Sequence, residues 1–445
     1  MSRFASAFGV SSWGGVLRAR HMLSRPTWRD ELPSLMNEAL KLDIPLLACG
    51  LRRSYGDSGL NPNGGLIDMT SLDRVVHFDP ETRLLRAEAG LSIDTILRII
   101  VHQGYFIPVT PGTRFVTIAG AIANDVHGKN HHRTGTIGRW VRRIGLLRSD
   151  GEEIELAADD TTGLFAATVG GLGLTGLITW VELEVIPIQS AIIDVENIPF
   201  GNTKEFFHLA EASEADFEYS VSWIDCLSGG DRLGRGIFMR GNHAKLGSRL
   251  LDSGNTALTM PVSLPAVAMN SYSIRAFNAA YFYRGSKKSG KSRAGIYPFF
   301  YPLDSIGRWN RMYGRRGMYQ YQSVVPPSVQ EDATNEMLKT IAASGQGSFL
   351  AVLKTFGSIQ SPGLLSFPRE GTTLALDFPN RGETTLKLMD RLDAIVMEAK
   401  GRLYPAKDGR MPARVFQAGY PDWRLFSKHI DPVFRSGFWT RVSQD

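Results

Sequence analysis

A glycine-bracketed loop that follows an apolar run constrains the fold of this chain more than any other feature. The segment Ala48-Cys49-Gly50-Leu51-Arg52-Arg53-Ser54-Tyr55-Gly56-Asp57-Ser58 comes directly after residues 44–47. Glycines at such positions can take positive φ and let backbone N–H groups approach an anion without interference from a Cβ atom. The pattern predicts a phosphate cradle after a strand, and an ordinary glycine-rich turn is the alternative reading of this segment alone.

A second segment rich in small residues covers positions 111–132. Its glycines and alanines permit the close backbone approach that a flat ring system or a diphosphate requires, and tight helix packing is the alternative. His127, His131 and His132 also raise the question of a metal site. Adjacent histidines diverge on either a helix or a strand, and no nearby Cys or Glu completes a ligand set. We therefore expect no metal here.

A third segment, Gly170-Gly171-Leu172-Gly173-Leu174-Thr175-Gly176, contains the formal pattern G-x-G-x-x-G. The Rossmann fingerprint must open a helix and be followed by a ribose-binding acid about 20 residues later. Here the glycines run directly into the alternating strand pattern of residues 177–186. The geometry excludes a Rossmann nicotinamide site and indicates a glycine loop that feeds a strand.

A late loop, residues 401–410, holds Lys407 between a proline and a glycine after a short apolar strand. A lone lysine in a loop is usually a solvated surface charge. The Pro/Gly punctuation also suits a cation that is held in a defined place, so both interpretations stay open at this point.

The composition indicates a globular chain that is too long for one hydrophobic core. Its 445 residues are 43% hydrophobic and 21% charged, with a net charge of +6. The only cysteines, Cys49 and Cys226, lie too far apart in sequence for metal-ligand spacing and argue against a disulfide scaffold. The densest basic patch, residues 284–293, predicts a surface loop, with attraction to an anionic lipid surface or a phosphorylated substrate as the functional alternative.

The sequence shows no targeting or membrane-spanning signal, which predicts a soluble or peripherally associated protein. No secretory signal is evident at the start of the sequence, and no apolar run approaches the roughly 20 residues of a spanning helix. We expect a cytoplasmic location, with peripheral membrane association and a location on the periplasmic face as the alternatives.

Hydrophobic periodicity predicts an α+β fold whose pattern of strands and helices changes after Pro187. Before Pro187, short strands such as 84–88 alternate with a few helices, and Ser92 caps a helix that ends near Gly104. The turn Asp150-Gly151 predicts a hairpin. After Pro187, aromatic-rich strands predict an antiparallel sheet with helices on one face. The predicted strands are 217–223, 236–239, 318–325, 349–354 and 373–378, and the predicted helices are 328–343 and 385–400. Residues 242–293 show no clear periodicity.

Together these motifs resemble the polyprenylphosphoryl-β-D-ribose 2-oxidase family of the vanillyl-alcohol-oxidase superfamily. The resemblance spans nearly the whole chain. It includes His-Gly-Lys-Asn-His-His at 127–132, Trp-Asn-Arg-Met-Tyr-Gly at 309–314, Asp-Phe-Pro at 377–379 and Tyr-x-Ala-Lys-Asp at 404–408. It implies a two-lobed, PCMH-type FAD-binding domain at 1–190, a substrate-binding domain at 191–401 and a C-terminal segment, 402–445, that returns to the flavin.

The resemblance also implies the site residues. The positions that it assigns to FAD are Ala48, Cys49, Gly50, Leu51, Arg52, Arg53, Ser54, Tyr55, Gly56, Asp57, Ser58, Gly112, Thr117, Ile118, Ala119, Gly120, Asn124, Asp125, Val126, His127, Ile178, Tyr404 and Lys407. The positions that it assigns to the substrate are Lys129, Trp223, Gln320, Gln322, Lys354 and Ala375. Among these, Lys407 is the candidate for stabilising negative charge on the reduced flavin. His127 is the candidate for positioning the substrate hydroxyl or accepting its proton.

Two positions set this chain apart from some relatives. Many members of the superfamily carry a flavin-linked histidine where this chain has Arg53, so the resemblance implies FAD that is bound without a covalent link. Mycobacterial members carry a cysteine, the target of covalent nitroaromatic inhibitors, where this chain has Ala375. Covalent trapping should therefore be impossible at this position.

The function that the resemblance implies is FAD-dependent oxidation of the 2′-hydroxyl of a polyprenylphosphoryl ribofuranose. The 2′-keto product would be reduced by a nicotinamide-dependent partner, which completes epimerisation to the arabinose form. A soluble sugar or alditol oxidase that uses oxygen is the alternative. A non-catalytic protein that binds anionic membranes or nucleic acid is a remote one, because no aromatic platform is interleaved with the basic residues; we expect no nucleic-acid partner.

Overall fold

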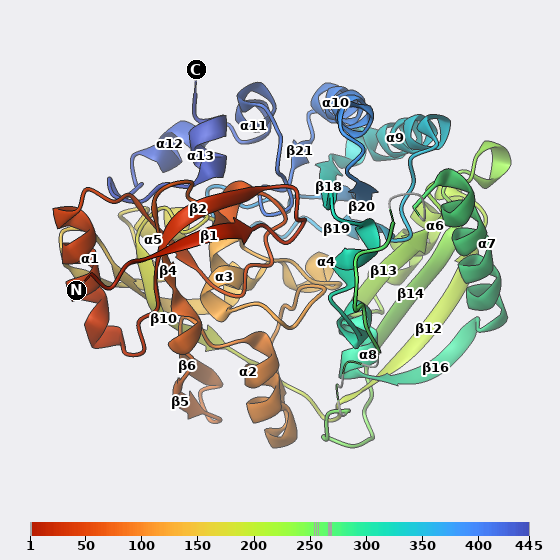
Figure 1. Cartoon of the computed structure of the whole chain (residues 1–445). Coiled ribbons are helices and arrows are strands. Elements are labelled where there is room, and N and C mark those ends of the chain that lie inside the picture. The colour runs from red at the N-terminus through yellow and green to blue at the C-terminus, as the bar shows by residue number, and fades with distance from the viewer. Residues whose placement is uncertain (1, 253, 255, 257, 266–268, 445) are drawn as a thin grey trace.

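The computed structural model describes residues 2–252, 254, 256, 258–265 and 269–444. Three sheets dominate it (Figure 1). Two smaller ones come from the first half of the chain, and the largest comes from the second half. This mixed arrangement is the α+β class that the periodicity predicts.

The smaller sheets carry the glycine loops. One is four-stranded, in the order β1 (Ala5–Ser11), β2 (Arg18–Ser24), β4 (Gly65–Asp68) and β3 (Leu46–Cys49). The other is five-stranded, in the order β5 (Val75–Asp79), β6 (Leu84–Glu88), β10 (Leu177–Glu184), β8 (Val141–Leu147) and β9 (Glu153–Ala157). The helices in this part of the chain are α1 (Leu32–Lys41), α2 (Ile93–Ile100), α3 (Ile118–Ala123), α4 (His131–Thr134) and α5 (Leu164–Thr168).

Several local predictions are confirmed in this half. The Ser92 side chain caps α2 by accepting from the Thr95 N–H, and Gly104 ends the following turn in the left-handed conformation. Strands β8 and β9 form the predicted antiparallel hairpin, with Gly151 at φ +89°. Helix α5 precedes the loop 170–176, which leads straight into β10 and leaves no helix for a Rossmann site.

The third sheet has eight strands, in the order β16 (Gly290–Gly295), β12 (Ile192–Phe200), β14 (Gly236–His243), β13 (Tyr219–Ile224), β19 (Ala351–Phe356), β20 (Gly371–Pro379), β18 (Met318–Val325) and β21 (Arg402–Leu403). Helices α6 (Thr203–Ser213), α9 (Gln330–Ser344) and α10 (Glu383–Glu398) pack on one face. The other face, at β18, β19 and β20, looks toward the glycine loops.

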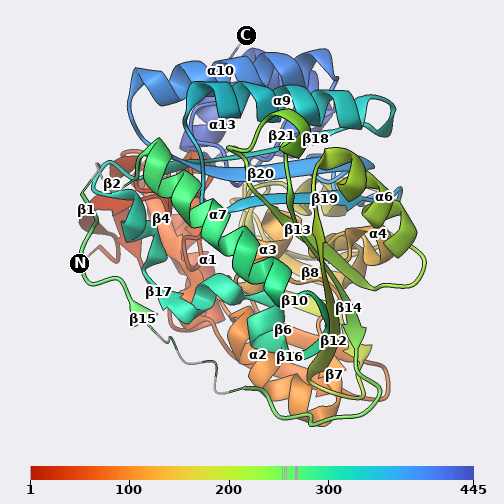
Figure 2. The ribbon, with the colours of Figure 1, turned by 90° about the vertical axis from the view of Figure 1, so that its right-hand side faces the viewer.

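The aperiodic region hides a long helix, α7 (Ser271–Lys287), on that other face. Phe238 of β14 packs with Phe206 of α6, whereas its neighbour Ile237 lies under Gly285 of α7. Successive side chains of a strand point to opposite faces, so α6 and α7 flank the sheet on opposite sides (Figure 2). The predicted surface loop at 284–293 is therefore wrong, because this segment ends α7 and forms β16, which pairs with β12.

Three helices, α11 (Ala413–Gly419), α12 (Trp423–Ser427) and α13 (Gly437–Val442), end the chain (Figure 1). Helix α11 packs on β21 and α10, whereas α13 packs on residues 57–59 and Phe426 of α12 lies near Gly171. Leu46 of β3 donates to the Val433 carbonyl and accepts from the Arg435 N–H. The domain boundaries at 190 and 401 stay predictions. Within the described ranges, no helix has the length and apolar character that crossing a membrane needs.

Candidate active site

A cavity of about 420 Å³ separates the glycine loops from the eight-stranded sheet. Most of the residues that the sequence assigns to a site line it. From the first half these are Ala48, Cys49, Gly50, Leu51, Arg52, Arg53, Ser54, Tyr55, Gly56, Ser58, Gly112, Thr117, Ala119, Gly120, Asn124, Val126, His127 and Ile178. From the second half they are Gln320, Gln322, Lys354, Ala375, Tyr404 and Lys407.

Three residues assigned to FAD lie behind the cavity wall. Asp57 turns away and pairs with Arg441 at 2.7 Å. Ile118 is buried in the hydrophobic core. The carboxylate of Asp125 is also buried, and it accepts from the Gly138 N–H and from the hydroxyls of Ser361 and Ser366. These side chains shape the wall from behind.

Two residues assigned to the substrate also lie outside the wall. The Lys129 ammonium donates to the Phe299 carbonyl, and burial lowers the pKa of Lys129 to about 7. Trp223 donates from its indole to the Phe349 carbonyl at 2.8 Å and packs on Tyr281 of α7. Sequence spacing did not reveal these partners, because they come from distant segments.

In the loop after β3, the residue with positive φ is not one of the glycines. The left-handed residue is Arg52, at φ +52°, and its guanidinium is 2.9 Å from Asp68. Gly50 and Gly56 serve close packing instead. A Cβ atom on Gly50 would lie 2.2 Å from the Thr117 hydroxyl oxygen, and one on Gly56 would lie 1.6 Å from the Asp408 carbonyl oxygen.

This loop presents hydrogen-bond donors to the cavity. Among the described residues, no group accepts a hydrogen bond from the backbone N–H of Leu51, Arg52, Arg53 or Ser54, all of which line the cavity. Four successive N–H groups and the nearby guanidinium groups form a donor set that suits a diphosphate. Gly112 adds open space, since a Cβ atom there would contact nothing within 4 Å.

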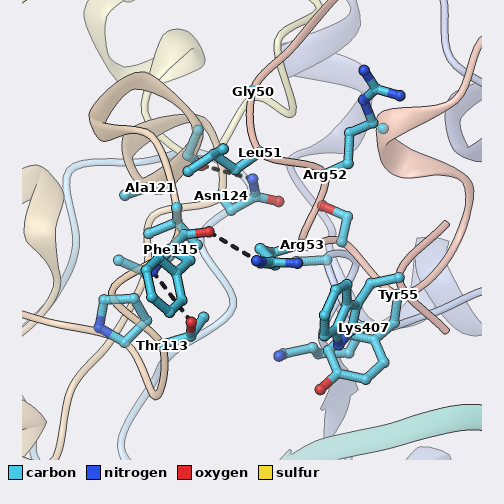
Figure 3. Close-up of a pocket in the computed structure, with 18 of the residues that line it drawn as sticks. Gly50, Leu51, Arg52, Arg53, Tyr55, Thr113, Phe115, Ala121, Asn124 and Lys407 are labelled. Carbon is cyan, nitrogen blue, oxygen red and sulfur yellow. Dashed lines mark hydrogen bonds between the residues drawn. The ribbon is translucent and has the colours of Figure 1, made fainter. Parts of the chain in front are cut away.

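Lys407 reaches the cavity beside Tyr55 (Figure 3). Its ammonium lies 4.3 Å from the centroid of the Tyr55 ring, and no described residue accepts a hydrogen bond from it. Burial lowers the pKa of Lys407 to about 8, and the negative charge of Asp377 opposes that shift. Lys407 is thus a buried cation with three unused donors at the cavity wall.

Asp377 is the counter-charge to Lys407. It is fully buried on β20, and its Oδ1 accepts from the Gln320 amide at 2.8 Å. Oδ2 of Asp377 and Oε1 of Gln320 are buried and make no hydrogen bond within the described residues. Burial raises the pKa of Asp377 to about 7, although Lys407 acts to lower it.

His127 is held at both ring nitrogens. Lys354 Nζ is 2.8 Å from its Nδ1, and Gln322 Nε2 is 3.1 Å from its Nε2. Burial lowers the pKa of His127 well below its ordinary value, and the charge of Lys354 adds to this effect. Burial likewise lowers the pKa of Lys354 to about 7. His127 is therefore neutral and fixed in orientation.

The histidines of this segment do not converge. His131 packs its ring against Phe356 with centroids 4.5 Å apart, whereas His132 bonds to the Phe217 carbonyl. In the part of the chain that the structure describes, no group of His, Cys, Asp and Glu is arranged to hold a metal ion.

Several wall residues could not be assigned to the site from the sequence. Trp13, Phe115, Asp304 and Trp309 line the cavity, and the Arg53 guanidinium lies 4.1 Å from the centroid of Trp13. The Trp309 segment and the Asp377-Phe378-Pro379 segment both carried the family resemblance, which was the available signal. Trp13 and Phe115 gave no signal, because their role depends on contacts that only the folded chain makes.

Comparison with known proteins gives this cavity its context. A family model described as an FAD binding domain matches residues 21–157. Decaprenylphosphoryl-β-D-ribose oxidase of Mycolicibacterium smegmatis is 38% identical over 417 residues, which cover 89% of each chain. The chain belongs to the decaprenylphosphoryl-β-D-ribose oxidase family.

More distant relatives share less. An uncharacterized protein of Streptomyces coelicolor is 30% identical over 79% of this chain and all of its own length. D-lactate dehydrogenase of Anaerostipes hadrus is 24% identical over 41% of this chain and 40% of its own. The similarity to the D-lactate dehydrogenase thus covers less than half of either chain, whereas the similarity to the decaprenylphosphoryl-β-D-ribose oxidase covers 89% of both.

Members of this family are FAD-dependent oxidoreductases that act on CH–OH groups, and so is this protein. The cavity fits the cofactor. The unpaired N–H groups of residues 51–54 suit its diphosphate, and the buried, unpaired Oδ1 of Asn124 suits a ring N–H donor. Lys407 supplies positive charge to the same cavity.

Proposed function

We propose that this protein oxidises the 2′-hydroxyl of a polyprenylphosphoryl-β-D-ribofuranose to the 2′-ketone. The observation that carries the proposal is one shared cavity, in which Lys407 and His127 lie beside Gln320, Gln322, Lys354 and Ala375. These side chains offer amide and ammonium groups for a hydroxylated, phosphate-bearing sugar. The acceptor of the hydride would be FAD in the same cavity.

FAD would be held by the loop 48–58, by Gly112, by the segment 117–127, and by Ile178, Tyr404 and Lys407. Bound FAD supplies the two-electron acceptor for the alcohol. We propose that it is bound without a covalent link, because the position of the flavin-linked histidine is held by Arg53, whose guanidinium contacts the Phe115 carbonyl and the Trp13 ring. Acid precipitation of the yellow protein should leave all the flavin in the supernatant.

His127 would hold two side chains of the substrate pocket in place and would not serve as the base. A neutral imidazole has one donor and one acceptor nitrogen. If Nδ1 accepts from Lys354, then Nε2 carries the proton and donates to the amide oxygen of a rotated Gln322. No lone pair of the ring is then left to accept the hydroxyl proton. The ring instead fixes Lys354 and Gln322 at the wall.

Lys407 would stabilise the charge that develops on oxidation. Oxidation of the alcohol removes a hydride from carbon and a proton from oxygen, so negative charge accumulates on the acceptor. A fixed cation placed at such a site in advance typically lowers the barrier by about 3 kcal/mol. Lys407 suits this role because its ammonium is buried and makes no hydrogen bond to a described residue.

Anaerobic reduction of the purified holoenzyme tests the proposal. The flavin absorbance should bleach on addition of lipid-linked ribose phosphate and stay unchanged with free alditols. Bleaching by alditols alone would identify a soluble sugar oxidase instead, and a colourless protein would identify a non-catalytic binding protein. Adding a nicotinamide-dependent keto-reductase should convert the ketone to the arabinose form and complete the epimerisation.

A further inference from the structure

An exposed aromatic helix lies on the same face of the large sheet as the cavity. Val352 of β19 lines the cavity and pairs in register with Trp223 of β13, whose ring packs on Tyr281 of α7. In-register neighbours on adjacent strands share a face, so α7 and the cavity are neighbours on one surface of the sheet. Figure 2 shows α7 crossing the front of the molecule.

A series of ring contacts connects the cavity wall to this helix. Trp309 lines the cavity and contacts Tyr313 at 6.3 Å, and Tyr313 contacts Phe349 at 6.3 Å between centroids. Phe349 in turn packs on Phe277 of α7 at 4.9 Å. Phe277 stacks with Tyr281 at 5.9 Å. The aromatic packing is therefore continuous from the cavity wall to α7.

The outward side of α7 is apolar for a helix that faces solvent. Tyr272 is 83% exposed and Tyr283 is 60% exposed, and Phe277 and Tyr281 are nearly half exposed. Ala276, Ala279 and Ala280 are exposed on the same helix. Only Ile274 and Asn278 are buried among its residues. Exposed aromatic clusters of this kind mark a surface that contacts a partner or a membrane interface.

The charge of the segment is entirely positive. Residues 271–293 contain Arg275, Arg284, Lys287, Lys288, Lys291 and Arg293 and no Asp or Glu. Arg293 pairs with Asp194, whereas the described residues provide no ion-pair partner for Arg284, Lys287, Lys288 or Lys291. Lys291 lies across the strand pair from Glu196, which pairs with Arg240 at 2.7 Å on the α6 side of the sheet, so Arg284, Lys287 and Lys288 are the cations that α7 itself presents.

We propose that α7 forms a docking surface for an anionic lipid bilayer. The aromatic side chains of α7 would enter the interfacial region, and Arg284, Lys287 and Lys288 would lie against the lipid phosphates. This proposal rests on the proposed function, since a lipid-linked substrate must reach the cavity from a membrane. A bilayer on α7 would lie on the same face of the sheet as the cavity. Helices with aromatic residues on one side and lysines beside them bind membranes in this way.

Vesicle flotation of the FAD-loaded protein tests this surface without any substrate. Wild-type protein should float with phosphatidylcholine vesicles that contain phosphatidylglycerol, and binding should weaken with salt and on pure phosphatidylcholine. The variant R284Q/K287Q/K288Q should bind at least about tenfold more weakly. The variant Y272S/Y283S should lose about tenfold in affinity on the same vesicles.

Matched controls separate vesicle binding by this surface from nonspecific electrostatic and hydrophobic binding. The variant K41Q/K204Q/K428Q removes equal charge at exposed sites on other elements and should float like wild type. The variant F8S removes a 73% exposed aromatic from β1 and should also float like wild type. Folding of every variant is checked by flavin content and melting temperature.

Several results would overturn the proposal. These are equal binding to neutral and anionic vesicles, unchanged binding of both α7 variants, and no binding by wild-type protein. A concentration-dependent dimer that Y272S/Y283S abolishes would show that a second copy covers the helix instead. Failure of the proposed function has a different signature, because a detergent-dispersed substrate would then fail to bleach the flavin whatever the vesicles show.

Discussion

Lys407 and Tyr55 meet at the cavity although they come from opposite ends of the sequence. The ammonium lies 4.3 Å from the ring centroid. The backbone fixes this pair, since the Tyr55 N–H donates to the Ala406 carbonyl at 2.9 Å. The loop that presents N–H donors and the loop that presents the cation are therefore one structural unit.

Replacing Lys407 with alanine should remove the cation and leave the fold intact. We expect the rate of flavin bleaching by substrate to fall about 10²- to 10³-fold, the loss typical for one aligned electrostatic group. Anaerobic stopped-flow measurement at matched FAD content reports this directly. Lys428→Ala, at an exposed position, is the control. Full activity in the Lys407 variant would remove this residue from the mechanism.

The pH dependence of the reaction should report Lys407 and its counter-charge. The ammonium form predominates below the lowered pKa of about 8, so the bleaching rate should fall as the pH rises through that value. Asp377 holds this pKa up. Asp377→Asn removes the negative charge and should move the alkaline limb down by about one pH unit.

A structural role alone would not produce that shift. Asp377→Glu restores the charge and should return the alkaline limb toward its wild-type position. Asp422→Asn changes an exposed carboxylate and should leave the profile unchanged. An identical profile in wild type and Asp377→Asn would show that Asp377 does not act on Lys407.

Gly56 should tolerate no side chain. An added Cβ atom would lie 1.6 Å from the Asp408 carbonyl oxygen, and backbone cannot yield as a side chain does. Gly56→Ala should therefore separate the two loops, and FAD affinity should fall more than about tenfold. Fluorescence titration of apoprotein with FAD measures this. Gly229→Ala, where nothing lies within 4 Å of the new atom, should bind FAD like wild type.

Arg441 of α13 should couple the chain end to both loops. Its guanidinium contacts Asp57 at 2.7 Å and Asp408 at 2.9 Å. Burial raises the pKa of Asp57, so losing the arginine leaves that carboxylate poorly compensated. Arg441→Gln should lower the free energy of unfolding by about 2–3 kcal/mol and weaken FAD binding.

Denaturant unfolding and FAD titration test this coupling. Arg435→Gln serves as the control. Arg435 is exposed, and among the described side chains its guanidinium bonds only to Thr440. Equal stability of Arg441→Gln and wild type would show that the C-terminal helix does not brace the loops.

Local signals predicted much of the fold. The Ser92 cap, the Asp150-Gly151 hairpin and the loop that feeds β10 depend on neighbours in sequence, and each is confirmed. Helix α7 escaped prediction because its exposed side carries tyrosines and alanines, so no apolar stripe stands out. The positive φ at Arg52 was likewise hidden, since the flanking glycines seemed to supply that conformation.

Site residues that stand in sequence motifs could be predicted, whereas those whose role depends on tertiary contacts could not. His127 and Lys407 stand in recognisable segments and reach the cavity. Asp377 and Arg441 act through partners dozens to hundreds of residues away. Asp125 stands in a motif yet points behind the wall, because three donors from other segments hold its carboxylate there.

A cysteine introduced at position 375 should test whether the cavity is accessible to a thiol reagent. It lines the cavity on β20, beside Gln322 of β18. The natural cysteines are buried, and burial raises the pKa of both Cys49 and Cys226 to about 12, so wild type should resist thiol reagents. Ala375→Cys should take up one equivalent of a small maleimide, and substrate should slow the labelling because it occupies the same space. Mass spectrometry of the intact protein counts the adducts, and Ala375→Ser is the control without a thiol. Labelling of wild type at the same rate, or no labelling of Ala375→Cys in the folded protein, would mean that this wall does not face an accessible cavity.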